Sequence, residues 1–218
     1  GPQGFASADQ NTVVNQAIVG SSGNYQLIVS ADGCVSLPQN IDVIVNPIPI
    51  ANPTNNGPVC SGSTIQFSTN TASGMTYTWS GPNGFNANVA TPNLTNVDVN
   101  DAGQYNLIVS LNGCTSSVST TDVQIWANPI VSASASSDSI CWGESVDLSV
   151  SGVTEAVWQP GVINALSINV SPLSTTQYSV VGEDINGCGG TDNVTIVVIE
   201  PNINASASPA STNIPGSV

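Results

Sequence analysis

The stretch DAGQYNLIVSLNGC at residues 101–114 decides the fold, because the chain contains it in more than one copy. The stretch GSSGNYQLIVSADGC at residues 20–34 aligns with residues 100–114 without gaps, at a spacing of 80 residues. A looser copy, TTQYSVVGEDINGC, follows at residues 175–188. The tyrosine and the cysteine are separated by 9, 9 and 10 residues in the three copies. A unit that recurs at such a period is typical of a tandem repeat, in which each copy forms one structural module.

The part of the chain that precedes each of these copies is also repeated. PVCSGSTIQF at 58–67 resembles SICWGESVDL at 139–148, and a tryptophan follows each, at Trp79 and Trp158. GPQGF at 1–5 matches GPNGF at 81–85, and the sequence after Glu200 resembles the start of a further unit. We therefore predict the C-terminal part of a truncated repeat at 1–47, complete repeats at 48–128 and 129–200, and the start of a truncated further repeat at 201–218.

Hydrophobic alternation predicts strands throughout the repeats. Ile65 and Phe67 share one face, and Met75, Tyr77 and Trp79 alternate in the same way, whereas no stretch has a convincing period of 3.6. Asn-Gly pairs before the cysteines are strong hairpin signals. Short strands with turns every 8–12 residues are typical of a two-sheet sandwich. The predicted fold class is all-β, with tandem immunoglobulin-like or PKD-like β-sandwich domains in an extended rod.

The DAGQY motif adds a specific feature to this sandwich. Asp-x-Gly-x-Tyr before an alternating strand is the tyrosine-corner signature, so Tyr105 should bury its ring and bond its hydroxyl to nearby backbone. Antibody domains place a core cysteine two residues after this tyrosine, where this chain has Leu107. The predicted core residues are Tyr25, Trp79, Tyr105, Leu107, Trp158 and Tyr178.

The five cysteines fall at two positions of the repeat. Cys60 and Cys141 lie near the start of their repeats, which we call the early position. Cys34, Cys114 and Cys188 lie after the repeated tyrosine, which we call the late position. We predict the disulfides Cys60–Cys114 and Cys141–Cys188, each worth about 4 kcal/mol in the chain-entropy model, with the partner of Cys34 outside the segment. In a standard sandwich the early and late positions can lie at opposite ends, so this pairing requires an unusual path of the first strand. Disulfides indicate an oxidising compartment.

Composition excludes several function classes. The chain has 14 acidic residues and no Lys, Arg or His, which gives a net charge of −14. Without cations it cannot neutralise nucleic-acid phosphates, and an anionic membrane surface would repel it. No apolar run is long enough for a membrane span, so we expect no membrane insertion. A Ser-His-Asp arrangement is impossible within this chain, and the acids are scattered, so we predict no enzymatic activity and no catalytic residue.

Two acidic stretches offer oxygen ligands to Ca²⁺, the one cofactor that the sequence suggests. Asp98 and Asp101 lie in VDVND, and Glu183 and Asp184 lie in EDING. Neither stretch has an EF-hand pattern, and the simpler explanation is a hydrated hairpin turn for EDING and a tyrosine-corner Asp for VDVND. No other metal or cofactor is expected.

Two tryptophans are candidates for contacts outside the core. Trp126, in VQIWANP, should point outward, and the aligned VIVNP of the first repeat lacks it. It can pack against the next repeat or stack on a sugar. Trp142, beside Cys141, can belong to the core or to such a contact.

The motifs GPNGF, DAGQY, NGC, WQPG and TTQY together resemble the Ig-like and PKD-like repeats of giant Bacteroidetes cell-surface adhesins, including the mobile adhesins of gliding flavobacteria. The resemblance covers nearly the whole chain and brings no catalytic residue. It implies export by the type IX route and contact with substrata, polysaccharide or other cells.

The function predicted from these features is a non-catalytic extracellular stalk in a large surface adhesin. Its partners would be neighbouring repeats of the same chain, with surface polysaccharide or other cell-surface proteins as further partners. Two alternatives stay open: a carbohydrate-binding accessory module of a secreted enzyme, and a self-assembling fibre subunit that is completed by strands from neighbouring copies.

Overall fold

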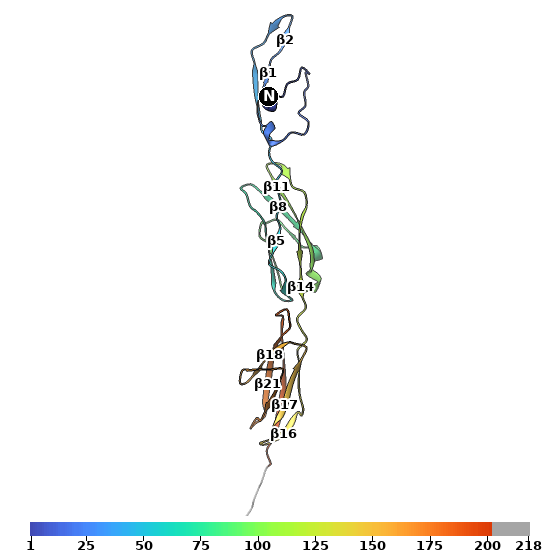
Figure 1. The fold of residues 1–218 in the computed structure, drawn as a ribbon, viewed down its shortest axis with the longest axis vertical. Coiled ribbons are helices and arrows are strands. Elements are labelled where there is room, and N and C mark those ends of the chain that lie inside the picture. The colour runs from blue at the N-terminus through green and yellow to red at the C-terminus, as the bar shows by residue number, and fades with distance from the viewer. Residues whose placement is uncertain (202–218) are drawn as a thin grey trace, which may run out of the picture. The chain divides into compact units, whose positions relative to one another are not determined.

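The computed structural model describes residues 1–201 and divides into two compact units, Gly1–Trp126 and Ala127–Val218. Among the described residues, both units consist of strands and turns, and the short 3-10 helices all lie in unit 1 (Figure 1). The predicted start of a further repeat at 201–218 lies outside the described residues except for Pro201.

The first part of unit 1 contains a two-stranded antiparallel sheet. Its strands are β1 (Gly23–Leu27) and β4 (Gln39–Val43), and β2 (Ser30–Ala31) pairs with β3 (Cys34–Val35) in a hairpin. Tyr25 in β1 is half-buried and packs edge-on against Phe5, with ring centroids 5.7 Å apart. Its hydroxyl donates a 2.9 Å hydrogen bond to the Ser21 carbonyl, in η2 (Val19–Ser21).

The rest of unit 1 is a complete β-sandwich. One sheet contains β5 (Thr54–Asn55), β7 (Thr64–Ser68) and β10 (Asn93–Thr95). The other contains β8 (Thr76–Ser80), β9 (Asn86–Ala87), β11 (Gly103–Leu111), β12 (Cys114–Thr115) and β13 (Ser119–Val123). A separate parallel pair joins β6 (Val59–Cys60) to β14 (Ile125–Trp126).

Alternation along the strands builds the core of this sandwich. Residues of β7 alternate between buried and exposed, and Phe67 contacts the rings of Trp79 and Tyr105 at centroid distances of 5.3 and 4.6 Å. Trp79, Tyr105 and Leu107 are completely buried. The indole of Trp79 is also satisfied, because its Nε1 donates a 3.0 Å hydrogen bond to the Val89 carbonyl.

The GPNGF and DAGQY motifs meet in this core. A Cβ on Gly81 would collide with the ring of Tyr105, so only glycine lets the chain pass beneath that ring. Phe85 packs edge-on against Tyr105 at 5.3 Å, which mirrors the contact between Phe5 and Tyr25 in the first repeat. The two motifs therefore recur together because each supplies half of one packed corner.

Unit 2 is a second complete sandwich. One sheet contains β15 (Ser132–Ala135), β17 (Val146–Ser151) and β20 (Ser167–Val170). The other contains β16 (Ser139–Cys141), β18 (Glu155–Gln159), β19 (Ile163–Asn164), β21 (Thr176–Glu183) and β22 (Gly189–Ile199). β16 pairs with β22 in parallel, whereas β22 and β21 are antiparallel.

The core of unit 2 uses the equivalent residues. Trp158 is completely buried and donates a 3.0 Å hydrogen bond from Nε1 to the Ala165 carbonyl, and Tyr178 is 6% exposed. Two stacked sheets with alternating strands and a first strand that switches to the opposite sheet form an immunoglobulin-like sandwich. The predicted all-β, immunoglobulin-like fold class is confirmed.

Candidate functional site

The cysteines are the most distinctive chemical groups of the repeats. Cys60 and Cys188 are disulfide-bonded, whereas Cys34, Cys114 and Cys141 are free thiols. Because Cys114 and Cys141 are free, the structure contains neither the Cys60–Cys114 nor the Cys141–Cys188 disulfide that the sequence predicted.

Strand register in unit 2 explains why Cys141 and Cys188 do not pair. Cys141 lies opposite Ile199, at the end of β22, and Cys188 directly precedes Gly189, at its start. Ten steps along a strand span about 33 Å. A disulfide needs Cα atoms within about 7 Å, so the two cysteines are at opposite ends of the sandwich and out of reach.

The same geometry separates Cys60 from Cys114 in unit 1. Cys114 lies opposite Leu111, at the end of β11, and Gly103 at its other end pairs with Val123. Cys60 pairs with Trp126, which follows Val123 in the chain. Eight steps along β11 already span about 26 Å. The opposite-end topology of the standard sandwich therefore holds in both complete repeats.

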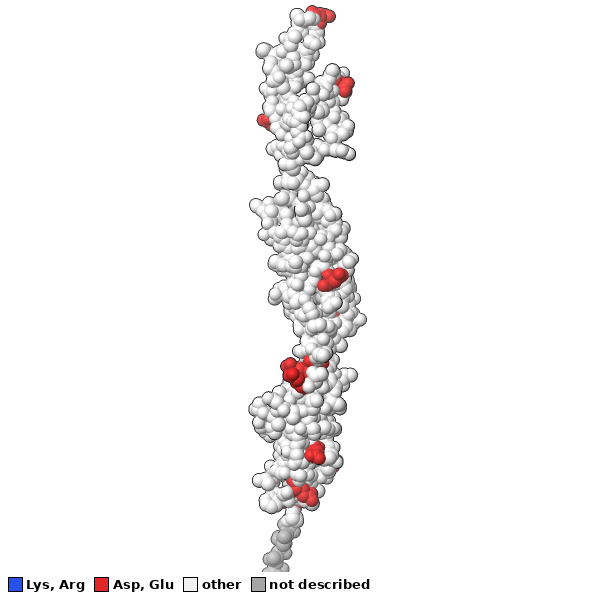
Figure 2. Space-filling view, viewed as in Figure 1, with Lys and Arg blue, Asp and Glu red and all other residues white. Residues whose placement is uncertain are grey.

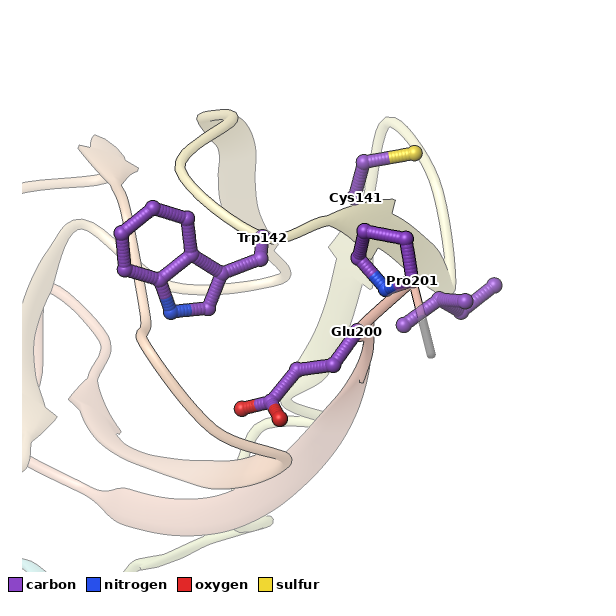
Figure 3. A pocket seen from close by; sticks show the side chains of 5 residues that line it. Cys141, Trp142, Glu200 and Pro201 are labelled. Atoms are coloured by element: carbon purple, nitrogen blue, oxygen red, sulfur yellow. The ribbon is translucent and has the colours of Figure 1, made fainter. Parts of the chain in front are cut away.

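The end of unit 2 that carries Cys141 has an apolar hollow of about 440 Å³ (Figure 3). It is lined by Cys141, Trp142, Ile199, Glu200 and Pro201. Figure 3 shows the Trp142 ring and the Cys141 thiol extending in different directions from adjacent positions of the chain. Trp142 is 58% exposed, so it belongs to the surface rather than to the core.

Trp126 has a different environment. It is half-buried in the short strand β14, directly opposite Cys60 in the parallel pair. Its carbonyl accepts hydrogen bonds from the backbone N–H of Ser61 at 2.8 Å and from the Ser61 hydroxyl at 3.1 Å. Its proposed contact with a neighbouring repeat or a sugar stays a prediction.

The carboxylates of Asp98 and Asp101 are used locally. Asp98 caps η4 (Val99–Asp101) by accepting a 2.7 Å hydrogen bond from the Asn100 N–H, and Asp101 accepts one of 2.9 Å from the Asp98 N–H. Asn83 donates a further 2.8 Å hydrogen bond to Asp101. The bond from the Asp98 backbone, followed by that from Asn83, lowers the pKa of Asp101 below its ordinary value of 3.8. These oxygens therefore stabilise the turn by accepting hydrogen bonds from it.

The second candidate calcium stretch also forms a turn. Asp184 accepts hydrogen bonds from the backbone N–H groups of Asn186 at 2.8 Å and Cys188 at 2.9 Å. Glu183 lies opposite Glu155 in the β18–β21 pair, so two like charges face each other there. Within residues 1–201, no three metal-ligating side chains come together.

Every charged side chain of the sequence is acidic. Figure 2 shows the acidic side chains in view as separate patches among uncharged residues, and the sequence has no Lys or Arg. No helix among the described residues is long and apolar enough to span a membrane.

One contact was missed by sequence reasoning. The Sγ of Cys114 lies 3.7 Å from the carbonyl oxygen of Asn46, and Asn46 donates a 3.2 Å hydrogen bond from Nδ2 to the Asn112 carbonyl. The hairpin of the second repeat thus contacts the residue that follows the last strand of the first. The 80-residue spacing was the available indication of this contact, because it aligns Asn46 with Trp126, the last residue of unit 1.

No protein-family model matches the chain, and no curated protein matches its sequence. Several solved structures are similar to it. Three N-terminal domains of the bacteriophage RB49 outer capsid protein Hoc match at 15% identity over 68% of this chain and 58% of that chain, with a TM-score of 0.35. Extracellular domains 3–5 of Drosophila OTK match at 12% identity over 84% and 73%, with a TM-score of 0.40. Murine CEACAM1b matches at 10% identity over 69% and 100%, with a TM-score of 0.35. At these scores the similarities carry no inference about function.

Proposed function

We propose that the chain is a non-catalytic extracellular stalk segment of a large bacterial surface adhesin, which holds an adhesive region away from the cell. One observation carries this proposal: the residues that recur between repeats are used to fold them. Tyr105 bonds to Asp101, Gly81 passes beneath the Tyr105 ring, and Trp79 is buried and hydrogen-bonded. A repeated module whose shared residues are structural is suited to setting a length.

Two properties of the sequence favour an extended array. The seams are short and contain proline, as in NPIPIANP at 46–53, ANPI at 127–130 and EPNIN at 200–204. Proline restricts φ and stiffens such a joint. A net charge of −14 without any cation opposes collapse of the chain onto itself or onto other copies.

The chemistry of the cysteines and the motifs support a surface location. Disulfides persist in oxidising environments outside the cytosol. The resemblance of the repeats to Bacteroidetes adhesins supports type IX export and a role in adhesion to substrata, with gliding motility as the finer form of this proposal. The partners would be neighbouring repeats and the surface polysaccharides or proteins that the adhesive region contacts.

The stalk can be tested by exchange in the native adhesin. Residues 48–200 would be replaced by unrelated immunoglobulin-like repeats of equal length, and in a second strain they would be deleted. We expect the replacement to preserve cell adhesion, measured as cells retained on a surface under flow, and the deletion to reduce it. Loss of adhesion in the replacement strain, with normal surface display, would show that these residues bind a ligand themselves.

Exposed Trp142 beside its apolar hollow favours one alternative, a carbohydrate-binding module, because sugars stack on exposed aromatic rings. A glycan array tests it with the wild-type segment, Trp142→Ala, Trp126→Ala and the control Ile185→Ala, which alters a residue that is 88% exposed. We expect no glycan to bind any of them. Tight binding that either tryptophan variant loses and the control keeps would replace the stalk with the carbohydrate-binding function.

A further inference from the structure

We propose that residues 45–52 of unit 1 form a locked joint, with Asn46 and Asn70 as the residues that position it. The joint holds the repeat at 1–47 on the repeat at 48–128, so that these two repeats move as one rigid body. Its role rests on the proposed stalk function, because a stalk keeps its reach only when its joints do not bend freely. The two can fail separately, since a flexible joint would leave the result of the repeat-replacement experiment unchanged.

The first repeat holds the beginning of the joint. Ser22, directly before β1, bonds to both backbone groups of Val45, which follows β4 by two residues. The Ser22 hydroxyl accepts a 2.9 Å hydrogen bond from the Val45 N–H and donates one of 3.4 Å to the Val45 carbonyl. Val45 is also half-buried. These bonds fix the direction in which the chain leaves the first repeat.

The second repeat holds the very next residue. Asn46 donates a 3.2 Å hydrogen bond from Nδ2 to the Asn112 carbonyl, and its own carbonyl oxygen lies 3.7 Å from the Sγ of Cys114. Both partners belong to the hairpin that joins β11 to β12. Val45 and Asn46 are therefore bonded to different repeats although they are neighbours in the chain. No residue lies between the two points of attachment.

Asn70, which lies just after β7, holds the far end of the joint. Its Nδ2 donates a 3.0 Å hydrogen bond to the Ile50 carbonyl, and its Oδ1 accepts one of 3.3 Å from the Asn52 N–H. The hydroxyl of Thr69 donates a further 3.0 Å hydrogen bond to the same Oδ1, which orients the amide. One side chain thus satisfies backbone groups on both sides of residue 51, as a neighbouring strand would.

The residues between these attachments have little conformational freedom. Pro47 and Pro49 each fix φ at about −65°. A proline also restricts the residue before it to extended conformations, which applies here to Asn46 and Ile48. Pro49 is buried, and Ala51 is part of the core of the second repeat. The chain from 46 to 51 is therefore held by hydrogen bonds, by proline rings and by burial together.

Residual dipolar couplings of the backbone amides test the joint in the full chain. They report how strongly each repeat is oriented in a weakly aligning medium. We expect the couplings of β1 and β4 to fit the same alignment tensor, with the same magnitude, as those of β8 and β11. A tensor for the first repeat that is smaller than that of the second by about half or more would show independent motion and would overturn the proposal.

A double variant tests the two positioning residues. Asn46→Ala/Asn70→Ala removes the amide hydrogen bonds at both ends and keeps every proline, so we expect the tensor of the first repeat to fall to about half that of the second. The matched control is Asn86→Ala, because Asn86 donates a 2.8 Å hydrogen bond from Nδ2 to the Gly84 carbonyl, outside the joint. The control should keep one common tensor.

Two outcomes of the variants would overturn the assignment of the amides. One is a single common tensor in the double variant, and the other is an equal loss of orientation in the control. Thermal melts supply a second readout, since neither amide belongs to the core of the second repeat and its Tm should stay as in the wild type. A loss of orientation that is accompanied by a lower Tm would assign the amides to folding and would likewise overturn the proposal.

Discussion

The hydroxyl of Tyr105 donates a 2.8 Å hydrogen bond to the carbonyl oxygen of Asp101, four residues earlier in the chain. Tyr25 makes the equivalent bond to Ser21 at 2.9 Å. The ring is held in the core while its polar end closes the turn that leads into the strand. The pKa of Tyr105 is raised above its ordinary value of 10.0, mainly by burial and also by the nearby charge of Asp101. The hydroxyl therefore stays protonated and remains a donor at neutral pH.

Tyr105→Phe removes this hydroxyl and leaves the Asp101 carbonyl without its side-chain partner. We expect the free energy of unfolding of the sandwich to fall by about 1 kcal/mol, the typical contribution of one such hydrogen bond. Urea denaturation checks this value. Tyr77→Phe is the matched control, because the hydroxyl of Tyr77 makes no hydrogen bond within the described residues, and it should change stability by less than about 0.5 kcal/mol. Equal effects of the two substitutions would contradict the assigned role.

Gly81→Ala tests why the GPNGF motif accompanies the tyrosine corner. The added methyl group would collide with the Tyr105 ring, and overpacking of this kind destabilises a core by about 1–3 kcal/mol. The double variant Gly81→Ala/Tyr105→Leu should be more stable than the sum of the single effects predicts, because the smaller side chain gives room for the methyl group. Strict additivity in urea denaturation would show that the two residues are not coupled.

The fold was readable from the sequence because its local signals agree. The alternation around Phe67, the turn at Asn112 and the corner at Tyr105 all predict one sandwich. Asn112 and Gly113 have φ values of 50° and 80°, as an Asn-Gly hairpin turn requires. Each of these features depends on residues that are close in the chain or share a strand.

The disulfide pattern could not be read in the same way. Counting two cysteines in each complete repeat favours pairs within repeats, but the register of β22 places Cys141 and Cys188 at its opposite ends. That register depends on which strands pair in space, which spacing alone does not fix. The apolar hollow at Trp142 was equally hidden, because the sequence left that residue between core and surface.

Acid should weaken the second repeat through Asp101. The pKa of this carboxyl is lowered in the folded state by the Asp98 N–H and by Asn83, so its stabilising effect is complete above its ordinary value of 3.8 and is lost as the pH falls through the lower folded value. The difference in Tm between the wild type and Asp101→Asn should therefore be constant at neutral pH and shrink below about pH 4. Asp122→Asn is the control for loss of one charge, and a pH-independent Asp101→Asn difference would contradict this role.

Glu155→Gln should stabilise unit 2. Glu155 lies directly opposite Glu183, and removing one of two facing like charges is worth about 0.2–1 kcal/mol. The gain should diminish at high salt, which screens exposed charges.

Thermal melts with calcium chloride, against sodium chloride at the same ionic strength, test the calcium alternative. A specific calcium-dependent rise in the wild-type Tm that Glu155→Gln or Asp184→Asn abolishes would establish a metal site there.

Small-angle X-ray scattering of the segment tests the stalk most directly, because a stalk must be long in solution. Three repeats, each about 35 Å long and placed end to end, would give a radius of gyration of about 30 Å. We expect this value, with little change between low and high salt. A compact chain of this length would give about 17 Å. A value near the compact one, or a collapse to it at high salt, would contradict the proposed stalk.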